Sequence, residues 1–231
     1  MAKTKIEPRR LPVIKKAQPK TPVIGVFSPC DPRIDTLSRE RSRNVVSMVA
    51  ETISGQVCLP DKTPVPVVYS TVLVDSEAQA DVVAQQFRKA GVNILVCAPD
   101  TWAFPQLTTI SLLQQFPADT PLNITCGNSG PKPGVVYAHA VNGAISQYGR
   151  MVSLNVGSWP DIGQEPKMSK PTGQALIDWC YAAVTAQALR GRRALIWGHD
   201  SMGMETALMH VIPTRNTFGL EITRLDMKLL A

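Results

Sequence analysis

Apolar runs rich in β-branched residues alternate with longer amphipathic segments, and this alternation constrains the fold more than any other feature of the sequence. The first five runs are nearly continuous in hydrophobicity: Pro22–Ser28, Val65–Thr71, Asn93–Pro99, Leu122–Gly127 and Met151–Gly157. Continuously apolar strands are typical of parallel sheets that are covered on both faces. The sequence therefore predicts five parallel β-strands.

The segments between these strands have helical character. They are Thr36–Ser54, Ser76–Ala90, Gln106–Phe116 and Pro133–Tyr148. In the second segment, apolar residues recur at helical spacing after an N-cap at Asp75 or Ser76, and Gly91 follows as a C-cap. Five βα units in this order predict an α/β fold with an open, doubly wound parallel sheet, whose ligands gather at the carboxyl ends of the strands.

A second unit is expected after residue 171. Its predicted elements are a helix at Thr172–Arg190, a strand at Arg193–Gly198, a helix from about Ser201 to Val211, a strand at Leu220–Leu225 and a further helix from about Asp226. Two strands are too few for a stable sheet. We therefore expect residues 22–171 to form a first domain, and residues 172–231 to be the truncated beginning of a second α/β domain.

The net charge of +6 does not indicate a nucleic-acid-binding groove. The first twenty residues hold seven Lys or Arg against one Glu, which accounts for the whole excess. With its prolines, the segment 1–21 is typical of a disordered basic arm. A groove built into the fold would need basic residues elsewhere, so we expect no nucleic-acid partner.

Other global features favour a cytoplasmic protein that has no membrane span. No stretch approaches the roughly 20 apolar residues that a spanning helix needs. The basic N-terminal segment lacks the apolar run of a signal peptide. The five cysteines form no CxxC pair, so we expect free thiols in a reducing compartment and no zinc site.

No complete catalytic motif is present, since the sequence lacks GxGxxG, a P-loop and GxSxG. The Gly-rich turn around Asn128 could present anion-binding amides or be a plain βα turn. His139 is best explained as a packed or surface residue of a helix. His199 follows a strand, and a functional role and simple proximity to a helix cap explain it equally well.

Two further residues stand in loops at predicted strand ends. Trp102 could stack on the apolar face of a sugar and donate its N–H to a hydroxyl, or it could cover the end of the sheet. Arg33 could bind a polyol, although a lone arginine is more often a surface charge.

Several segments together resemble the L-fucose isomerase family. The family's RPGAVYLAA…SQKG helix resembles Lys132–Ala140 and Ser146–Gly149, and its SMGI segment resembles Ser201–Met204. The family's Asp-Gly-Arg corresponds to Asp31–Arg33, and its loop tryptophan corresponds to Trp102. Its VDM segment corresponds to Asp226-Met227. The similarity runs from about Ile24 to the end of the chain. Phe27 stands where the family has an arginine, so L-fucose and D-arabinose both stay open as substrates.

The resemblance implies a flavodoxin-like first domain in a hexameric aldose–ketose isomerase. It implies an ene-diol reaction at a Mn²⁺ ion held by a Glu, an Asp and a His that lie outside this chain. It also implies that the first domain closes a neighbouring subunit's pocket, with sugar contacts from Arg33, Trp102, Asn128 and Met202. This fragment alone would then be inactive and hold neither catalytic nor metal-binding residues. A non-catalytic sugar- or nucleotide-binding α/β module is the alternative.

Overall fold

A computed structural model describes residues 21–198, 204, 206 and 208–226. The chain divides into two compact units: one at Thr21–Ala188, and a second that begins at Leu189. The first unit extends past residue 171, where the sequence placed the domain boundary. Helix α5 (Lys170–Leu189) accounts for the difference, because Leu176, Ile177 and Cys180 are buried in the same apolar core as the sheet.

The first unit is built on five parallel strands, as the sequence predicts. They are β1 (Ile24–Phe27), β2 (Val67–Tyr69), β3 (Ile94–Cys97), β4 (Leu122–Cys126) and β5 (Val152–Val156), paired in the order β2-β1-β3-β4-β5. Every residue of β1, β3 and β4 is buried, which explains their unbroken apolar character. The fold is therefore an open doubly wound α/β domain.

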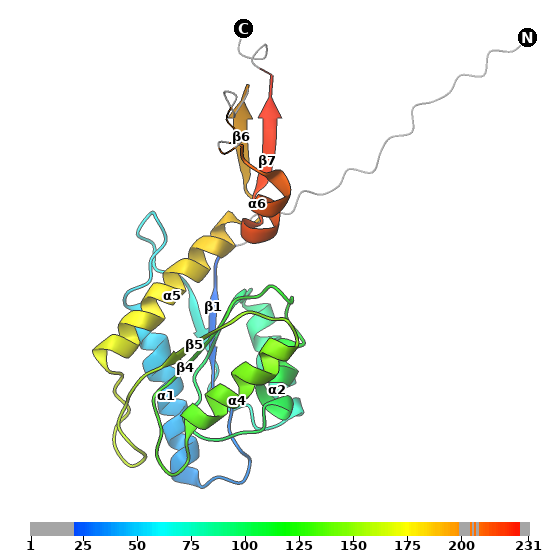
Figure 1. Cartoon of the computed structure of the whole chain (residues 1–231). Helices are drawn as coiled ribbons and strands as arrows, with labels where there is room; N and C mark the ends of the chain where they lie inside the picture. The colour runs from blue at the N-terminus through cyan, green and yellow to red at the C-terminus, as the bar shows by residue number, and fades with distance from the viewer. Residues whose placement is uncertain (1–20, 199–203, 205, 207, 227–231) are drawn as a thin grey trace, which may run out of the picture. The chain divides into compact units, whose positions relative to one another are not determined.

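Helices cover both faces of this sheet (Figure 1). Helices α1 (Thr36–Ser54) and α5 lie on one side, and α2 (Glu77–Lys89) and α4 (Gly134–Gln147) lie on the other. Between β3 and β4 the sequence predicts one helix. The structure instead has a π-helical turn, η1 (Gln106–Ile110), followed by the short α3 (Ser111–Leu113). A single π-turn of this kind often marks a functional site.

Helix starts follow the capping chemistry of the sequence. Asp35 caps α1, because its Oδ1 accepts a hydrogen bond of 2.8 Å from the Ser38 amide. Ser76 caps α2 through the Gln79 amide, which decides between the two predicted caps. Helix α4 has no side-chain cap, and its first residue, Gly134, lies directly against the loop that follows β3.

The second unit contains a two-stranded parallel sheet of β6 (Arg193–Trp197) and β7 (Glu221–Leu225), and α6 (Val211–Phe218) comes before β7 in the sequence. The helix expected up to Val211 lies mostly outside the described residues, and residues 208–210 are not helical. The sequence did not predict α6, which has Pro213 in its first turn and ends at Gly219, whose φ is 65°.

Candidate functional site

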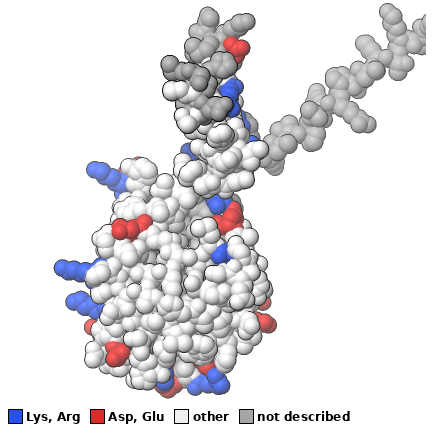
Figure 2. All heavy atoms as spheres, viewed as in Figure 1, with Lys and Arg blue, Asp and Glu red and all other residues white. Residues whose placement is uncertain are grey.

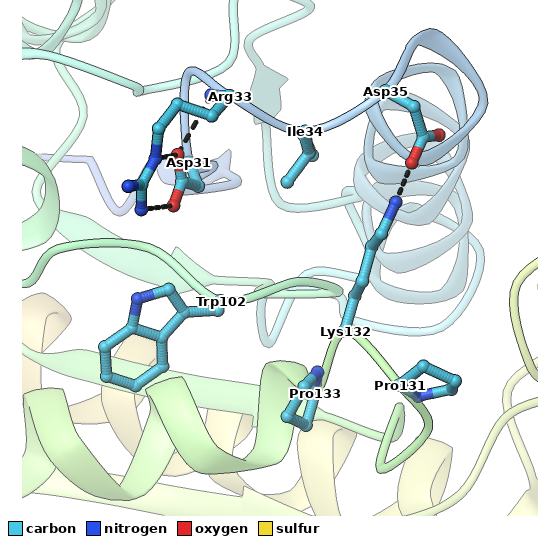
Figure 3. A pocket seen from close by; sticks show the side chains of 8 residues that line it. All are labelled: Asp31, Arg33, Ile34, Asp35, Trp102, Pro131, Lys132 and Pro133. Atoms are coloured by element: carbon cyan, nitrogen blue, oxygen red, sulfur yellow. Dashed lines mark hydrogen bonds and ion pairs between the residues drawn. The ribbon is translucent and has the colours of Figure 1, made fainter.

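A pocket opens at the carboxyl edge of the first unit's sheet, at the point where the strand order reverses. The chain leaves β1 toward β2 on one side, whereas β3, β4 and β5 follow on the other. The loops after β1 and β3 therefore diverge and leave a crevice, which is where open α/β sheets bind ligands. A cavity of about 630 Å³ lies there, lined by Asp31, Arg33, Ile34, Asp35, Trp102, Pro131, Lys132 and Pro133 (Figure 3).

The loop after β1 supplies an ion pair joined by two side-chain hydrogen bonds. Arg33 donates from Nε to Asp31 Oδ1 at 2.9 Å and from Nη2 to Asp31 Oδ2 at 2.7 Å. The Arg33 amide also donates to Asp31 Oδ1 at 2.9 Å. These hydrogen bonds from Arg33 lower the pKa of Asp31 below its ordinary value of 3.8, so Asp31 stays ionised. Because the Arg33 side chain is 72% exposed, its remaining N–H groups can reach a ligand.

The loop after β3 supplies an aromatic wall. Trp102 is half-buried, and its carbonyl accepts a hydrogen bond of 3.1 Å from the Asp31 amide, which joins the two loops. The ring of Phe104 lies 6.5 Å from the Trp102 indole in an edge-to-face arrangement. The Arg33 guanidinium lies over that same ring, 5.2 Å from its centroid. The two sequence-predicted residues Arg33 and Trp102 therefore meet in one pocket through Phe104.

The third wall comes from the turn before α4. Lys132 Nζ forms an ion pair with Asp35 Oδ2 and lies 3.1 Å from Ser38 Oγ, so this turn is tied to the beginning of α1 (Figure 3). The pocket lining thus holds two cations and two carboxylates in matched pairs. A balanced lining favours an uncharged polar ligand over a phosphate or another anion.

Asn128 does not line the pocket but supports the loops that do. Its side chain is fully buried. Its Nδ2 donates to the Asp100 carbonyl at 2.6 Å and to the Lys132 carbonyl at 3.3 Å, and its Oδ1 accepts from the Gly130 amide at 2.9 Å. The side chain therefore joins the loops that carry Trp102 and Lys132. Its contact with a sugar stays a prediction.

Beneath these loops lies a buried polar network that sequence reasoning missed. Asp100 is fully buried; its Oδ1 accepts from Trp159 Nε1 at 2.8 Å, and its Oδ2 lies 3.3 Å from Arg41 Nε. Arg41 also donates to the backbone carbonyls of Pro160, Asp161 and Gln164 in the loop after β5. Burial raises the pKa of Asp100, and Arg41 opposes that shift. The network joins the beginning of the loop that carries Trp102 to helix α1 and to the loop after β5.

The sequence of α1 contained one signal for this role. Arg41 stands four residues before Val45 and eight before Val49, on the buried stripe of the helix. Its neighbours Arg39 and Arg43 obscure this pattern, because three arginines in five residues are typical of a solvated helix face.

The described residues do not fit a manganese site. Mn²⁺ needs several converging carboxylate or imidazole ligands, and no group of three His, Cys, Asp or Glu side chains comes together in the part of the chain that the structure describes. His139 is exposed on α4, while His199 and Met202 lie outside the described residues.

Helix α4 carries no Asp, Glu, Lys or Arg, and the face of the molecule in Figure 2 shows sparse charges of both signs around its margin. Among the described helices, none is long and apolar enough to cross a membrane.

Residues 21–191 match the family model described as L-fucose isomerase, first N-terminal domain. The chain belongs to this family. The match contains all five strands of the first unit, the pocket and its supporting network. The family resemblance that the sequence motifs indicated is thereby confirmed.

Relatives of this L-fucose isomerase domain are distant in sequence but aligned over most of the chain. The L-fucose isomerase of Bacteroides fragilis is 24% identical over 221 residues, covering 90% of this chain and 35% of that protein. Those of Bacteroides thetaiotaomicron and Streptococcus pneumoniae are 21% and 22% identical, covering 90% and 81% of this chain and 35% and 31% of theirs. The chain therefore spans about a third of the length of these relatives.

Among solved structures, an ABC transporter from Rhodopseudomonas palustris superposes with a TM-score of 0.30 at 10% identity, covering 88% of this chain and 64% of that one. A likeness of this strength supports no argument about fold or function.

Proposed function

We propose that this chain is the N-terminal, substrate-facing part of an aldose–ketose isomerase that converts L-fucose to L-fuculose. One observation carries the proposal: in a chain of the L-fucose isomerase family, an indole and an ion-paired arginine line an electrically balanced pocket at the switch point of the sheet. These groups match the chemistry of a sugar, which has apolar C–H faces and uncharged hydroxyls.

Each pocket residue has a binding task and none has a proton-transfer task. The Trp102 indole offers a flat apolar surface to the C–H groups of the sugar. Arg33, held by Asp31, donates its remaining N–H groups to hydroxyls remote from the reacting carbons. Such contacts position the substrate, and positioning is a substantial part of the catalysis of a reaction between adjacent carbons.

We further propose that the proton transfer takes place elsewhere in the intact enzyme, through an ene-diol at a Mn²⁺ ion. The ion would stabilise the developing charge on the substrate oxygens, and its ligands would come from outside the described residues. In this proposal the enzyme is a hexamer in the cytoplasm, where the five cysteines stay as free thiols. The pocket of this chain would then complete the active site of a neighbouring subunit.

The charge balance of the pocket argues against a nucleotide-binding module. Unpaired cations would favour phosphate binding, whereas Lys132 and Arg33 are each bound to a carboxylate. D-arabinose has the same stereochemistry as L-fucose at the reacting end, and its use by this enzyme remains the second candidate within the family.

The test compares Trp102→Ala with Tyr148→Ala in the isomerase that contains this chain. Tyr148 is also aromatic, is 65% exposed and follows the end of α4 remote from the pocket. Loss of the stacking surface should weaken transition-state binding by about 1–3 kcal/mol and lower kcat/KM for L-fucose roughly tenfold to hundredfold. Tyr148→Ala should leave kcat/KM unchanged, and both variants should keep their metal content.

A mixing experiment tests the shared pocket. Subunits with Trp102→Ala are combined with subunits that carry a disabled metal ligand, and subunit exchange is confirmed by mass spectrometry. Partial recovery of activity is expected, because some mixed hexamers contain intact pockets. Absence of recovery after confirmed exchange would show that each subunit builds its own pocket.

A further inference from the structure

The Trp102 indole is oriented by packing. Among the described residues, no hydrogen bond holds its N–H; two neighbouring rings contact it edge-to-face, and the side chain also packs against the apolar core. Tyr137 meets it edge-to-face, with centroids 6.3 Å apart and planes at 84°. Phe104 meets it at 6.5 Å and 79°. An edge-to-face contact fixes the plane of a ring as well as its position.

These two neighbours differ greatly in how firmly they are held. Phe104 is 37% exposed, whereas the Tyr137 side chain is fully buried. The Tyr137 hydroxyl donates to Thr109 Oγ1 at 2.7 Å and lies 3.0 Å from Thr108 Oγ1, and both threonines belong to η1. Thr108 in turn donates to the Phe104 carbonyl at 2.7 Å. The π-helical turn therefore joins Tyr137 to the same loop that carries the indole.

The backbone around Tyr137 is equally constrained. Tyr137 stands three residues after Gly134, where a Cβ atom would lie 2.5 Å from the Pro99 carbonyl oxygen. Only glycine allows this approach, which presses the first turn of α4 against the loop after β3. The ring of Tyr137 is thus held at the base of the aromatic wall by its helix and by its hydroxyl.

We infer that Tyr137 is a positioning residue that fixes the plane of the Trp102 indole, and so presets the surface on which a sugar stacks. This inference rests on the proposed function for its ligand, but the ring geometry stands without it. An indole that is already ordered loses little side-chain freedom when a ligand binds. Without Tyr137 the ligand would have to order the indole, which should weaken binding about threefold to tenfold.

Three variants of the full chain separate positioning from general stability. Tyr137→Leu removes the ring, and Tyr137→Phe removes only the hydroxyl. Phe87→Leu removes a ring that is also fully buried and edge-to-face, 6.5 Å from Phe27, but lies on α2 remote from the pocket. If Tyr137→Leu does not fold, Tyr137→Met fills similar space without a flat ring and takes its place.

Two readouts are measured for each variant: the NMR order parameter of the Trp102 indole N–H in the chain, assigned with Trp102→Phe, and the dissociation constant for L-fucitol of the isomerase that contains the chain. We expect Tyr137→Leu to lower the order parameter and weaken L-fucitol binding about threefold to tenfold. Tyr137→Phe keeps the ring but loses the hydroxyl contacts with the η1 threonines, so it should fall between the wild type and Tyr137→Leu in both readouts. Phe87→Leu should stay close to the wild type at comparable stability.

An indole as ordered in Tyr137→Leu as in Phe87→Leu would overturn the inference, whatever L-fucitol does. If the wild type does not bind L-fucitol at all, the proposed function fails, while the order parameter still decides the role of Tyr137.

Discussion

Replacing Asp100 by asparagine removes the only carboxylate that the described residues place against the buried Arg41 guanidinium. The two side chains are 0% and 3% exposed, and Asp100 Oδ2 lies 3.3 Å from Arg41 Nε. Arg41 would then be a buried charge without a counter-charge, which destabilises a protein by about 3–5 kcal/mol. Urea unfolding followed by circular dichroism at pH 7 should show this loss of unfolding free energy.

The control is Asp75→Asn, the same chemical change in a more accessible pair. Asp75 lies 2.7 Å from Arg39, and the two side chains are 18% and 26% exposed. Its loss should lower the unfolding free energy by about 1 kcal/mol or less. Equal losses for Asp100→Asn and Asp75→Asn would refute the reasoning, because they would mean that burial adds nothing to the need for a counter-charge.

Three further predictions follow from local geometry. Gly134→Ala should lower the unfolding free energy by about 1–3 kcal/mol in thermal unfolding, because its Cβ would lie 2.5 Å from a backbone oxygen. Gly143→Ala in the same helix meets nothing within 4 Å and should raise the unfolding free energy by about 0.5–1 kcal/mol. A change of the same sign in both variants would contradict this prediction. A thiol reagent at pH 8 should modify only the half-buried Cys58 in the native chain, since burial raises the pKa of the other four thiols to about 11 or 12. Rapid reaction of two or more thiols per chain would be inconsistent with that burial. Because Arg33 lowers the pKa of Asp31, the pair contributes stability that is present above pH 3.8 and is lost as the pH falls through the lower native pKa. In Arg33→Gln the pKa of Asp31 should return toward 3.8, as measured by an NMR titration. An unchanged pKa of Asp31 would exclude Arg33 as the cause.

The sheet could be predicted because its signal is local. Continuous apolar runs report strands that are buried on both faces, and the βα alternation then leaves few topologies. The pocket could be placed for the same reason: Arg33 and Trp102 both follow strands, and parallel strands end at one edge. The family motifs then indicated Arg33 and Trp102, among the loop residues, as candidates for contact with a sugar.

The supporting contacts could not be predicted, because they join residues far apart in the sequence. Nothing near Arg41 reveals that Asp100 and the loop after β5 surround it. Likewise, the pairing of Tyr137 with the threonines of η1 depends on a π-helical turn that helical spacing alone does not indicate. Helix α6 was not predicted because it is short and contains weak helix formers, although Pro213 in its first turn and Gly219 after its last residue are start and stop signals.

Recognition of an uncharged sugar by the pocket can be tested directly. The test is an NMR titration of the isomerase that contains this chain with L-fucitol and, separately, with AMP, following the Trp102 indole N–H and the Arg33 Nε–H signals. L-fucitol should shift both signals saturably, the shifts should vanish in Trp102→Ala, and AMP should leave them unchanged because the cations of the pocket are paired. Saturable shifts with AMP and none with L-fucitol would contradict the account and favour a nucleotide-binding module.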